Sequence, residues 1–378
     1  MANVTLVTGG GGYVGTHTVK YLLDNTDDKV VIVDSFERSD RQFAEALKEV
    51  YKDRLVVKDV RLEDKEALSK ALADEKVTDV IHCCAYIEVP EGEENPGLYR
   101  QKILTTTQNL LAAMKENNVK RIVFSSTAAA YGPPQQGKVD ERGRITETHP
   151  LDASTVYGKW KVEAERAIMK AQEAGDIDSA TFFRYFNVAG ADPNLLIGEA
   201  HMPKETHALP LVILAGLGLR DEFTIYGNNL QTPDGTPVRD LIHVLDLANA
   251  HTIGLERMRD GRLRGVNAYN LGSGEGVSVR RMVDAVKKHL GKFKVKEKEE
   301  KRSAGEPDVL VASSEKAERE LGWRRRYGFD DIVLTAVQWT QKLAEAGWYN
   351  EKGITQKPYT FPPRTIEGGQ QAKKKELT

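Results

Sequence analysis

A glycine-rich segment near the N-terminus constrains the fold of this chain more than any other feature of its 378 residues. The segment reads TGGGGYVG at residues 8–15, after an apolar run typical of a β-strand and before a segment with helical spacing. Gly9, Gly12 and Gly15 stand three residues apart. Glycines at this spacing permit a tight turn, close approach of the backbone to a diphosphate and close helix–strand packing. The pattern predicts a dinucleotide-binding turn, with a structural turn and helix cap as the alternative.

Asp34 supports this interpretation because it ends the next strand-like run, 19 residues after Gly15. A carboxylate there can accept a hydrogen bond from an adenosine ribose and repels a 2′-phosphate, so the sequence favours NAD over NADP. No Lys-Ser or Lys-Thr follows the glycines, which argues against a P-loop. Asp59 ends the third strand-like run and could reach the adenine, although an isolated aspartate there more often starts a helix.

Short β-branched runs alternate with longer segments of helical spacing through the first half of the chain. The strand-like runs lie at 3–8, 30–34, 54–58, 79–84, 120–125 and 180–185. The helical segments lie at 14–24, 39–50, 63–75, 98–117 and 157–173. Continuous apolar strands separated by helices indicate a parallel sheet covered on both faces. The predicted fold is α/β: a doubly wound parallel Rossmann sheet with a smaller mixed α/β C-terminal substrate domain.

The alternation stops after about residue 190, where Pro, Gly and Asn become frequent. Further helices are expected at 208–219 and 244–258, and strands at 223–226 and 266–271, the last of which could rejoin the first sheet. We assign two ranges, 1–190 and about 239–272, to an NAD-binding Rossmann domain. We assign 191–238 and 273–350 to the substrate domain, and expect a strap or disordered tail at 351–378.

Composition excludes several classes of function. The chain carries 54 Lys plus Arg against 56 Asp plus Glu, a formal net charge of −2, so nucleic acid and acidic membranes are not expected partners. No run of about 18 apolar residues would span a bilayer. Cys83 and Cys84 are adjacent in an apolar run, and the 8 histidines show no ligand spacing, so neither a disulfide nor a metal site is expected. Since no secretory signal is evident, we expect a cytoplasmic protein.

A tyrosine and a lysine open the helix expected at 157–173. Tyr157 and Lys161 are four apart, so on a helix they share a face at about 5–6 Å. A free tyrosine has a pKa of about 10, and a base working near neutral pH needs roughly 3 units of lowering. Lys161 and the positive ring of oxidised NAD can both favour the phenolate. Thr127, in SSTAAAYG at 125–132, could position the reacting hydroxyl, or it could simply satisfy a strand end.

Five motifs together carry a resemblance to a known family: TGGGGYVG, SSTAAAYG, VYGKWK at 156–161, RYFNVAGAD at 184–192 and IYGNNLQTPDGTPVRDLIHVLDLANAH at 225–251. From about residue 4 to 345 the chain resembles the extended short-chain dehydrogenases/reductases, and within them the UDP-glucose (UDP-galactose) 4-epimerases. The resemblance implies an isomerase with tightly held NAD. In this family a tyrosine removes the proton of the sugar's 4-hydroxyl, and hydride leaves carbon 4 and returns to the other face of a 4-keto sugar.

The resemblance also implies roles for particular residues. Tyr157 corresponds to the base, Lys161 to the ribose clamp and Thr127 to the hydroxyl partner. The implied cofactor contacts, besides Tyr157 and Lys161, are Gly9, Gly12, Tyr13, Val14, Gly15, Asp34, Asp59, Val60, Ala85 and Tyr185. The implied substrate contacts, besides Thr127 and Tyr157, are Phe186, Asn187, His207, Tyr226, Arg239 and Arg302.

Some of these substrate roles have a specific chemistry. Tyr226 matches an aromatic ring that stacks on uracil. Arg239 and Arg302 match arginines that bind the diphosphate, since a guanidinium pairs with two phosphate oxygens. For either arginine, an ion pair with a neighbour such as Asp240 is the alternative.

The chain also departs from the family pattern. Ile87 stands where many members have a lysine near the cofactor phosphates, and Ile103 where an asparagine is usual. The position that often carries a bulky tyrosine at the sugar pocket corresponds to Leu310, or to Val309 in another register. A smaller side chain leaves room for an N-acetyl group, so UDP-GlcNAc and UDP-GalNAc are hypothesised as further substrates.

Three other functions were weighed. A nucleotide-sugar 4,6-dehydratase needs an acidic residue after the threonine, and this chain has Ala128 and Ala129 there. A UDP-glucuronate 4-epimerase or decarboxylase needs a cationic or hydroxyl site for the carboxylate; none is evident, and Glu88 would oppose it if it faces inward. A non-catalytic NAD-binding regulator typically loses the tyrosine or the lysine, and both remain here.

The family commonly forms homodimers by pairing two helices of the dinucleotide domain. The segments 98–117 and 157–173 would supply them here. Their apolar positions, which include Leu104, Leu111 and Met114, fit packing on the chain's own sheet equally well.

Overall fold

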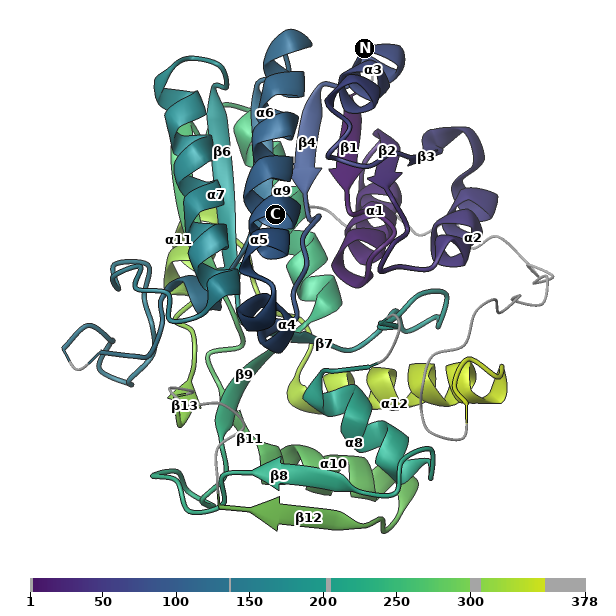
Figure 1. Cartoon of the computed structure of the whole chain (residues 1–378), viewed down its shortest axis with the longest axis vertical. Coiled ribbons are helices and arrows are strands. Elements are labelled where there is room, and N and C mark those ends of the chain that lie inside the picture. The colour runs from purple at the N-terminus through teal and green to yellow at the C-terminus, as the bar shows by residue number, and fades with distance from the viewer. Residues whose placement is uncertain (1–2, 136, 202–204, 300–306, 351–378) are drawn as a thin grey trace.

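The computed structural model describes residues 3–135, 137–201, 205–299 and 307–350 (Figure 1). Seven parallel strands form its central sheet in the order β10-β6-β5-β4-β1-β2-β3. Their bounds are β1 Val4–Thr8, β2 Lys29–Asp34, β3 Leu55–Asp59, β4 Asp79–His82, β5 Arg121–Thr127, β6 Ser179–Tyr185 and β10 Gly265–Leu271. The six strands expected in the first half are confirmed, and the strand expected at 266–271 does rejoin the sheet, beside β6.

Helices cover both faces of this sheet, as the continuous apolar strands predicted (Figure 1). One face carries α1 Tyr13–Asn25, α2 Arg41–Tyr51 and α9 Val244–Arg259; the other carries α3 Lys65–Glu75, α6 Thr106–Glu116 and α7 Val156–Glu173. Successive strand residues alternate between the two cores: Val7 and Ile32 pack with the first group of helices, and Leu6 and Val31 with the second. Because the strands are parallel, all their carboxyl ends lie on one edge.

The helix expected at 98–117 is interrupted. A short helix α4 (Val89–Glu94), another, α5 (Pro96–Tyr99), and a π-helical turn at Arg100–Thr105 precede α6. The Thr107 hydroxyl donates to the Ile103 carbonyl at 2.6 Å. Threonine hydroxyls that bond back to the preceding turn compete with regular helical bonds and bend helices.

A smaller domain lies below the carboxyl edge of the sheet (Figure 1). In it β8 Phe223–Tyr226 pairs with β12 Val295–Lys298, and β9 Val238–His243 pairs with β7 Asn187–Ala189, β11 Gly276–Ser278 and β13 Val309–Leu310. Helices α8 Ala208–Gly216, α10 Val279–Leu290 and α12 Phe329–Glu345 enclose its core. The remaining elements are α11 Glu315–Leu321 and the 3-10 turns Lys52–Arg54 and Ala128–Ala130.

One expected domain boundary differs from the structure. The sequence placed about 239–272 with the first domain, but β9 belongs to the second sheet, and only α9 and β10 return to the first. The apolar pattern of β9 is compatible with either sheet, and the strands that pair with β9 determine which sheet it joins. The tail expected at 351–378 lies outside the described residues.

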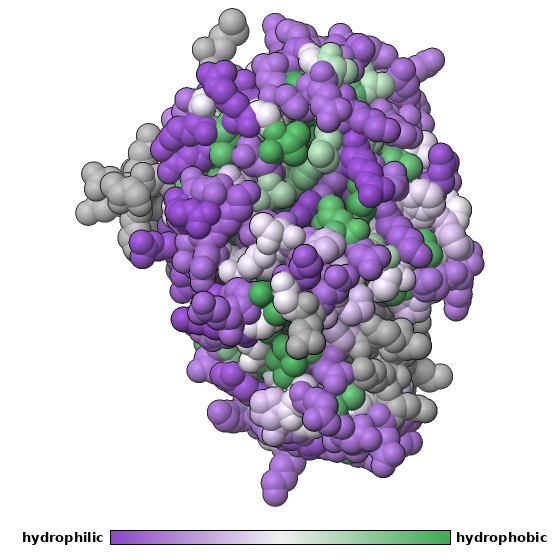
Figure 2. Space-filling model, turned by 90° about the vertical axis from the view of Figure 1, so that its left-hand side faces the viewer, coloured by the Kyte–Doolittle hydropathy of each residue, from purple (hydrophilic) through white to green (hydrophobic). Residues whose placement is uncertain are grey.

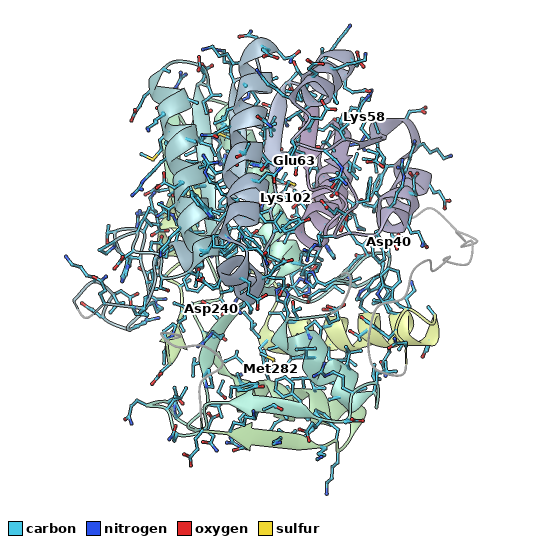
Figure 3. The ribbon with its side chains drawn as sticks, viewed as in Figure 1. Asp40, Lys58, Glu63, Lys102, Asp240 and Met282 are labelled. Carbon is cyan, nitrogen blue, oxygen red and sulfur yellow. The ribbon has the colours of Figure 1, made fainter. Side chains whose placement is uncertain are left out.

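Asp240, on β9, joins the first domain to the second through hydrogen bonds. It lies at their junction (Figure 3), fully buried. One of its oxygens accepts from the Ser273 backbone N–H and hydroxyl, both at 2.6 Å; the other accepts from the N–H groups of Gly274 and Ala312, both at 3.0 Å. Four donors therefore satisfy this carboxylate, so an ion pair with Arg239 is not its structural role.

The surface agrees with the balanced charge of the chain. Hydrophilic side chains cover most of the face in Figure 2, and apolar ones gather there only in small groups. In the described ranges, no helix has both the length and the hydropathy required to cross a lipid bilayer.

Candidate active site

The glycine turn between β1 and α1 has no room for side chains. Gly9 has a φ of +66°, and a Cβ there would lie 2.7 Å from the backbone of Cys84. A Cβ on Gly15 would lie 2.1 Å from the Gly9 carbonyl oxygen. Gly12 caps α1 without a side-chain hydrogen bond, so the first N–H groups of the helix are available to an anion. This cradle fits the diphosphate of NAD.

Asp34 lies beside this turn at the end of β2. Its carboxylate accepts hydrogen bonds from the Gly11 N–H at 2.9 Å and the Phe36 N–H at 2.8 Å, which hold it in place. Burial raises the pKa of Asp34, and these two bonds oppose the rise. Val60 donates its N–H to the Asp34 carbonyl at 3.1 Å. Asp59 lies farther out, exposed and 3.4 Å from Arg41, so it is less fixed than Asp34.

The other expected cofactor contacts lie on α1 and after the carboxyl ends of several strands. Tyr13 donates its hydroxyl to the Gly190 carbonyl at 2.6 Å, which ties α1 to the second half of the chain. Val14 packs against the core on the α1 side, and Ala85, after β4, packs against the core on the other side. Tyr185 ends β6, and burial raises its pKa well above the usual value.

Tyr157 and Lys161 lie in the first turns of α7, which begins after Thr155 as its cap. The Thr155 hydroxyl accepts the Gly158 N–H at 3.1 Å. The Lys161 ammonium lies 6.0 Å from the centre of the Tyr157 ring and donates to the Ser125 carbonyl at 2.7 Å. Burial lowers the pKa of Lys161 to about 8. The two residues thus share a face, as their spacing predicted.

Thr127, at the end of β5, lies close enough to Tyr157 to favour its phenolate, and its hydroxyl accepts the Ala129 N–H at 3.1 Å. Burial raises the pKa of Tyr157 to about 12, and Thr127 offsets only part of the rise. The expectation that Lys161 lowers this pKa is therefore not met by the protein groups alone. The physical reason is that burial dominates, while the ammonium is directed to a backbone carbonyl.

The adjacent thiols do not provide a nucleophile. Cys83 and Cys84 are free, and burial raises the pKa of Cys83 to about 11 and that of Cys84 to about 12. Both thiols therefore stay neutral near Lys161, and the two half-buried side chains pack beside the sheet.

A buried ion pair between Glu165 and Arg184 supports the strand ends of the site, and neither residue was among the predicted site residues. Glu165, one turn after Lys161, accepts from Arg184 Nε at 2.9 Å, from Arg184 Nη2 at 2.6 Å and from the Ser126 hydroxyl at 2.5 Å. Ser126 precedes Thr127, and Arg184 precedes Tyr185. The pair therefore fixes β5 and β6 against α7. The i, i+4 step from Lys161 to Glu165 was the available signal.

The expected substrate contacts come from both domains. Phe186 is buried against Ala128, Tyr131 and Leu310, whereas Val309 is exposed, so of the two alternatives Leu310 is the one that packs beside Phe186. Asn187 is exposed at the start of β7, and Arg239 on β9 lies in register with Leu310.

The remaining expected contacts lie farther along the second domain. Tyr226 ends β8, with the Lys298 ammonium 5.2 Å from its ring centre. His207 caps α8. Arg302 lies outside the described residues.

The two departures from the family pattern have different environments. Ile103 is buried in the core, and Ile87 is exposed. Near the loop that contains Ile87, Lys102 supplies positive charge. Its ammonium lies 2.7 Å from Glu63 and 5.2 Å from the centre of the Tyr86 ring (Figure 3).

Known proteins share this arrangement over nearly the whole chain. Residues 5–272 match the NAD dependent epimerase/dehydratase family. The UDP-glucose 4-epimerase of Halalkalibacterium halodurans is 38% identical over 335 residues, which cover 88% of this chain and 94% of that protein.

Solved structures agree. The UDP-glucose 4-epimerase of Bifidobacterium longum in complex with NAD+ and UDP has a TM-score of 0.83 at 32% identity, covering 93% of this chain and all of that one (100%). The UDP-Glc/GlcNAc 4-epimerase of Campylobacter jejuni has a TM-score of 0.76 at 31% identity, covering 90% of this chain and 100% of the other. The chain therefore belongs to the NAD-dependent epimerase/dehydratase family and, within it, to the UDP-glucose 4-epimerases, which are isomerases.

Proposed function

We propose that the protein inverts carbon 4 of a UDP-hexose, interconverting UDP-glucose and UDP-galactose, with Tyr157 as its base. The observation that carries this assignment is the proximity of Tyr157 to Thr127 and to the Lys161 ammonium, which lies 6.0 Å from its ring centre, at the end of β5. NAD, when bound, supplies a hydride acceptor and donor beside the sugar. The first domain provides its contacts, from Gly9 to Tyr185, and the second domain provides those of the UDP-sugar.

In this proposal Tyr157 takes the proton of the sugar's 4-hydroxyl, and Thr127 orients that hydroxyl. Lowering the phenol's pKa from about 12 toward neutrality requires roughly 5 units, or about 7 kcal/mol. The Lys161 ammonium supplies part of that charge stabilisation and also clamps the ribose. Tyr157 is therefore expected to ionise only when a second positive charge lies beside it, as in the oxidised holoenzyme.

The second domain is proposed to hold the nucleotide. Arg239 binds the diphosphate through its guanidinium, with Arg302 as a second such arginine. Tyr226 stacks on uracil, and Asn187 and His207 contact the substrate. Phe186 and Leu310 line the sugar pocket. Since Leu310 is smaller than a tyrosine, the pocket is proposed to admit an N-acetyl group, and the Campylobacter jejuni relative named above for UDP-Glc/GlcNAc supports this extension.

The competing functions are not favoured by the residues present. Ala128 and Ala129 follow Thr127, so no carboxyl group stands where a dehydratase needs one. Glu88 accepts a hydrogen bond from Thr206 at 2.5 Å, which places negative charge at the loop that a glucuronate carboxylate would approach.

We further propose that the protein is a homodimer and that it lies in the cytoplasm, a reducing compartment in which free cysteines remain thiols. The apolar positions Leu104, Leu111 and Met114 are buried in the monomer, so the dimer would use the outer faces of α6 and α7. Light scattering of the purified protein tests the dimer: a monomeric mass rejects it.

The experiment that tests the function compares wild type with Tyr157→Phe. Cofactor released on denaturation is expected to be unchanged, while turnover of UDP-galactose falls by roughly 10²–10⁴-fold or more. Tyr51→Phe, at the end of α2, is the matched control and retains activity. Full activity of Tyr157→Phe would remove the mechanism. Separate incubations with UDP-GalNAc and UDP-glucuronate then separate the substrate classes.

A further inference from the structure

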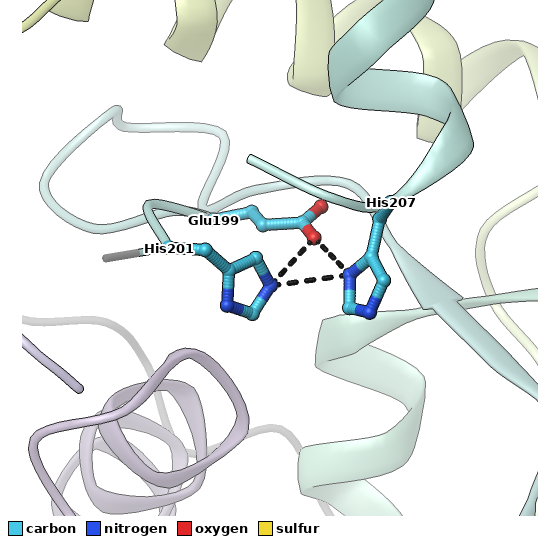
Figure 4. A group of neighbouring side chains, drawn as sticks. All are labelled: Glu199, His201 and His207. Carbon is cyan, nitrogen blue, oxygen red and sulfur yellow. Dashed lines mark hydrogen bonds and ion pairs between the residues drawn. The ribbon is translucent and has the colours of Figure 1, made fainter. Parts of the chain in front are cut away.

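Three side chains from separate points of one loop region converge beside the start of α8 (Figure 4). Glu199 Oε1 lies 2.5 Å from His207 Nδ1 and 3.0 Å from His201 Nε2, and the two nitrogens lie 3.1 Å apart. In the sequence the histidines are scattered and show no ligand spacing, so no metal site was expected. The structure brings two of them to one carboxylate oxygen.

Protons alone satisfy this triangle poorly. It has three edges, but each imidazole nitrogen in it carries at most one hydrogen. If both nitrogens donate to Glu199, two N–H groups oppose each other across 3.1 Å. If one nitrogen carries no hydrogen, its lone pair faces the carboxylate oxygen with no proton between them, unless the other histidine donates to it instead of to the carboxylate. A cation at the centre would accept electron pairs from all three atoms at once.

The dimensions suit a small divalent ion. Zinc binds imidazole nitrogen and carboxylate oxygen at about 2.0–2.2 Å. A point at about 2.0–2.1 Å from all three atoms exists on either side of their plane, since the triangle is small. Ideal tetrahedral separations of about 3.3–3.4 Å require the contacts to open by less than about 1 Å.

Glu205 is a second buried carboxylate beside this triangle. It is only 4% exposed, and its charge acts on Glu199, His201 and His207, although its oxygens are not grouped with the three ligand atoms. One of its oxygens, Oε1, accepts from the backbone N–H of His201 and from the Tyr349 hydroxyl, both at 3.1 Å. The other, Oε2, is buried and has no hydrogen-bond partner. Buried carboxylate oxygens are normally satisfied, so this one has capacity to accept a hydrogen bond from a water bound to the ion.

We propose that Glu199 Oε1, His201 Nε2 and His207 Nδ1 form a binding site for one divalent cation of the zinc class, with a water molecule as the fourth ligand. The carboxylate of Glu199, with that of Glu205 nearby, offsets the charge of the ion, and mixed nitrogen and oxygen ligands suit zinc rather than magnesium or calcium. The ion links the 199–201 loop to His207, the N-cap residue of α8. Ligation through Nδ1 leaves Nε2 of His207, whose side chain is 43% exposed, directed outward.

The test uses the untagged holoenzyme after treatment with a chelator and dialysis. Co²⁺ is titrated while visible absorption is recorded, and Zn²⁺ binding is measured by calorimetry and by displacement of Co²⁺. The expected result is one ion per chain, with the visible bands of tetrahedral cobalt and no sulfur-to-metal charge-transfer band. Mg²⁺ at the same concentration is expected to leave the spectrum unchanged.

Variants locate the site. Glu199→Gln and His201→Asn are expected to weaken Co²⁺ binding by more than the roughly 100-fold that loss of an outer ligand partner costs. His289→Asn, an exposed histidine on α10, is the control and binds as wild type. Circular dichroism checks that each variant folds. If His201→Asn does not fold, Glu199→Gln, which keeps the side-chain volume, decides: it is expected to lower the affinity and alter the cobalt spectrum.

Three results would overturn the proposal. Wild type that binds neither Co²⁺ nor Zn²⁺ removes the site. An affinity for Co²⁺ that is unchanged in Glu199→Gln places the ion elsewhere. A sulfur-to-metal band assigns it to Cys83 or Cys84. None of these outcomes depends on epimerase activity, so failure of this inference is distinguishable from failure of the proposed function.

Discussion

The buried ion pair between Glu165 and Arg184 gives a sharp prediction about stability. The side chains are 2% and 8% exposed, and two hydrogen bonds join them at 2.9 and 2.6 Å. Glu165→Gln keeps the shape but removes the charge, and its amide group turns a donor toward the guanidinium. Breaking a buried pair by neutralising one partner leaves an uncompensated charge and costs about 3–5 kcal/mol. We expect this loss in the free energy of unfolding.

Urea denaturation at neutral pH, followed by tryptophan fluorescence, measures the change. Glu163→Gln is the matched control on the same helix, because Glu163 pairs with Arg166 at 2.5 Å on the surface, with side chains 41% and 58% exposed. Exposed pairs contribute about 0–1 kcal/mol, so this control stays close to wild type.

A double variant separates the charge effect from the loss of packing. Replacing Arg184 by Met in the Glu165→Gln background removes the unpaired charge, so much of the lost free energy returns. If Glu165→Gln loses less than about 1 kcal/mol, the buried pair is not the support described above.

Three further predictions concern the site. Thr127→Val removes the hydroxyl proposed to bond the reacting groups in the complex, and hydrogen bonds to charged groups are worth about 1.5–3 kcal/mol, so kcat falls roughly 10- to 150-fold with cofactor content unchanged; an unaltered kcat contradicts the positioning role. Gly15→Ala places a Cβ 2.1 Å from a carbonyl of the turn, so the purified protein loses its cofactor, whereas Gly97→Ala, with nothing within 4 Å, keeps it. Burial lowers the pKa of Lys161 to about 8 from 10.5, so between these values the unfolded chain binds more protons and stability rises with pH, by up to about 3 kcal/mol. Lys161→Met removes this rise, and identical pH profiles of the free energy of unfolding in variant and wild type would refute the assignment.

The parallel sheet was predictable because its strands are continuous apolar runs. The helices between them are compatible with parallel pairing of successive strands. In the second domain the strand at 223–226 was predicted, whereas β7, β11 and β13 were not, because they have only two or three residues and show no usable period. The sequence of β9 was recognised within a motif but assigned to the first domain, since strand partners are set by tertiary packing.

The residues of the candidate site also divide into those that the sequence predicts and those that it does not. Gly9, Asp34, Thr127, Tyr157 and Lys161 lie at strand ends or helix starts, so their convergence follows from the fold alone. The convergence of His201 and His207 depends on the path of an irregular loop, which no periodicity reveals. The raised pKa of Tyr157 depends on burial by neighbours far away in the sequence, and that quantity exists only in the folded chain.

The return of the chain to the first sheet through α9 and β10 has a consequence for any attempt to divide this protein. An N-terminal fragment that stops near residue 190 would leave β6 as a bare edge and α1 without the helix packed beside it. Exposed edges of this kind pair with other chains and aggregate. The cofactor half is therefore not a portable module, and recombination between relatives preserves the protein only where it exchanges both of the segments that build that half.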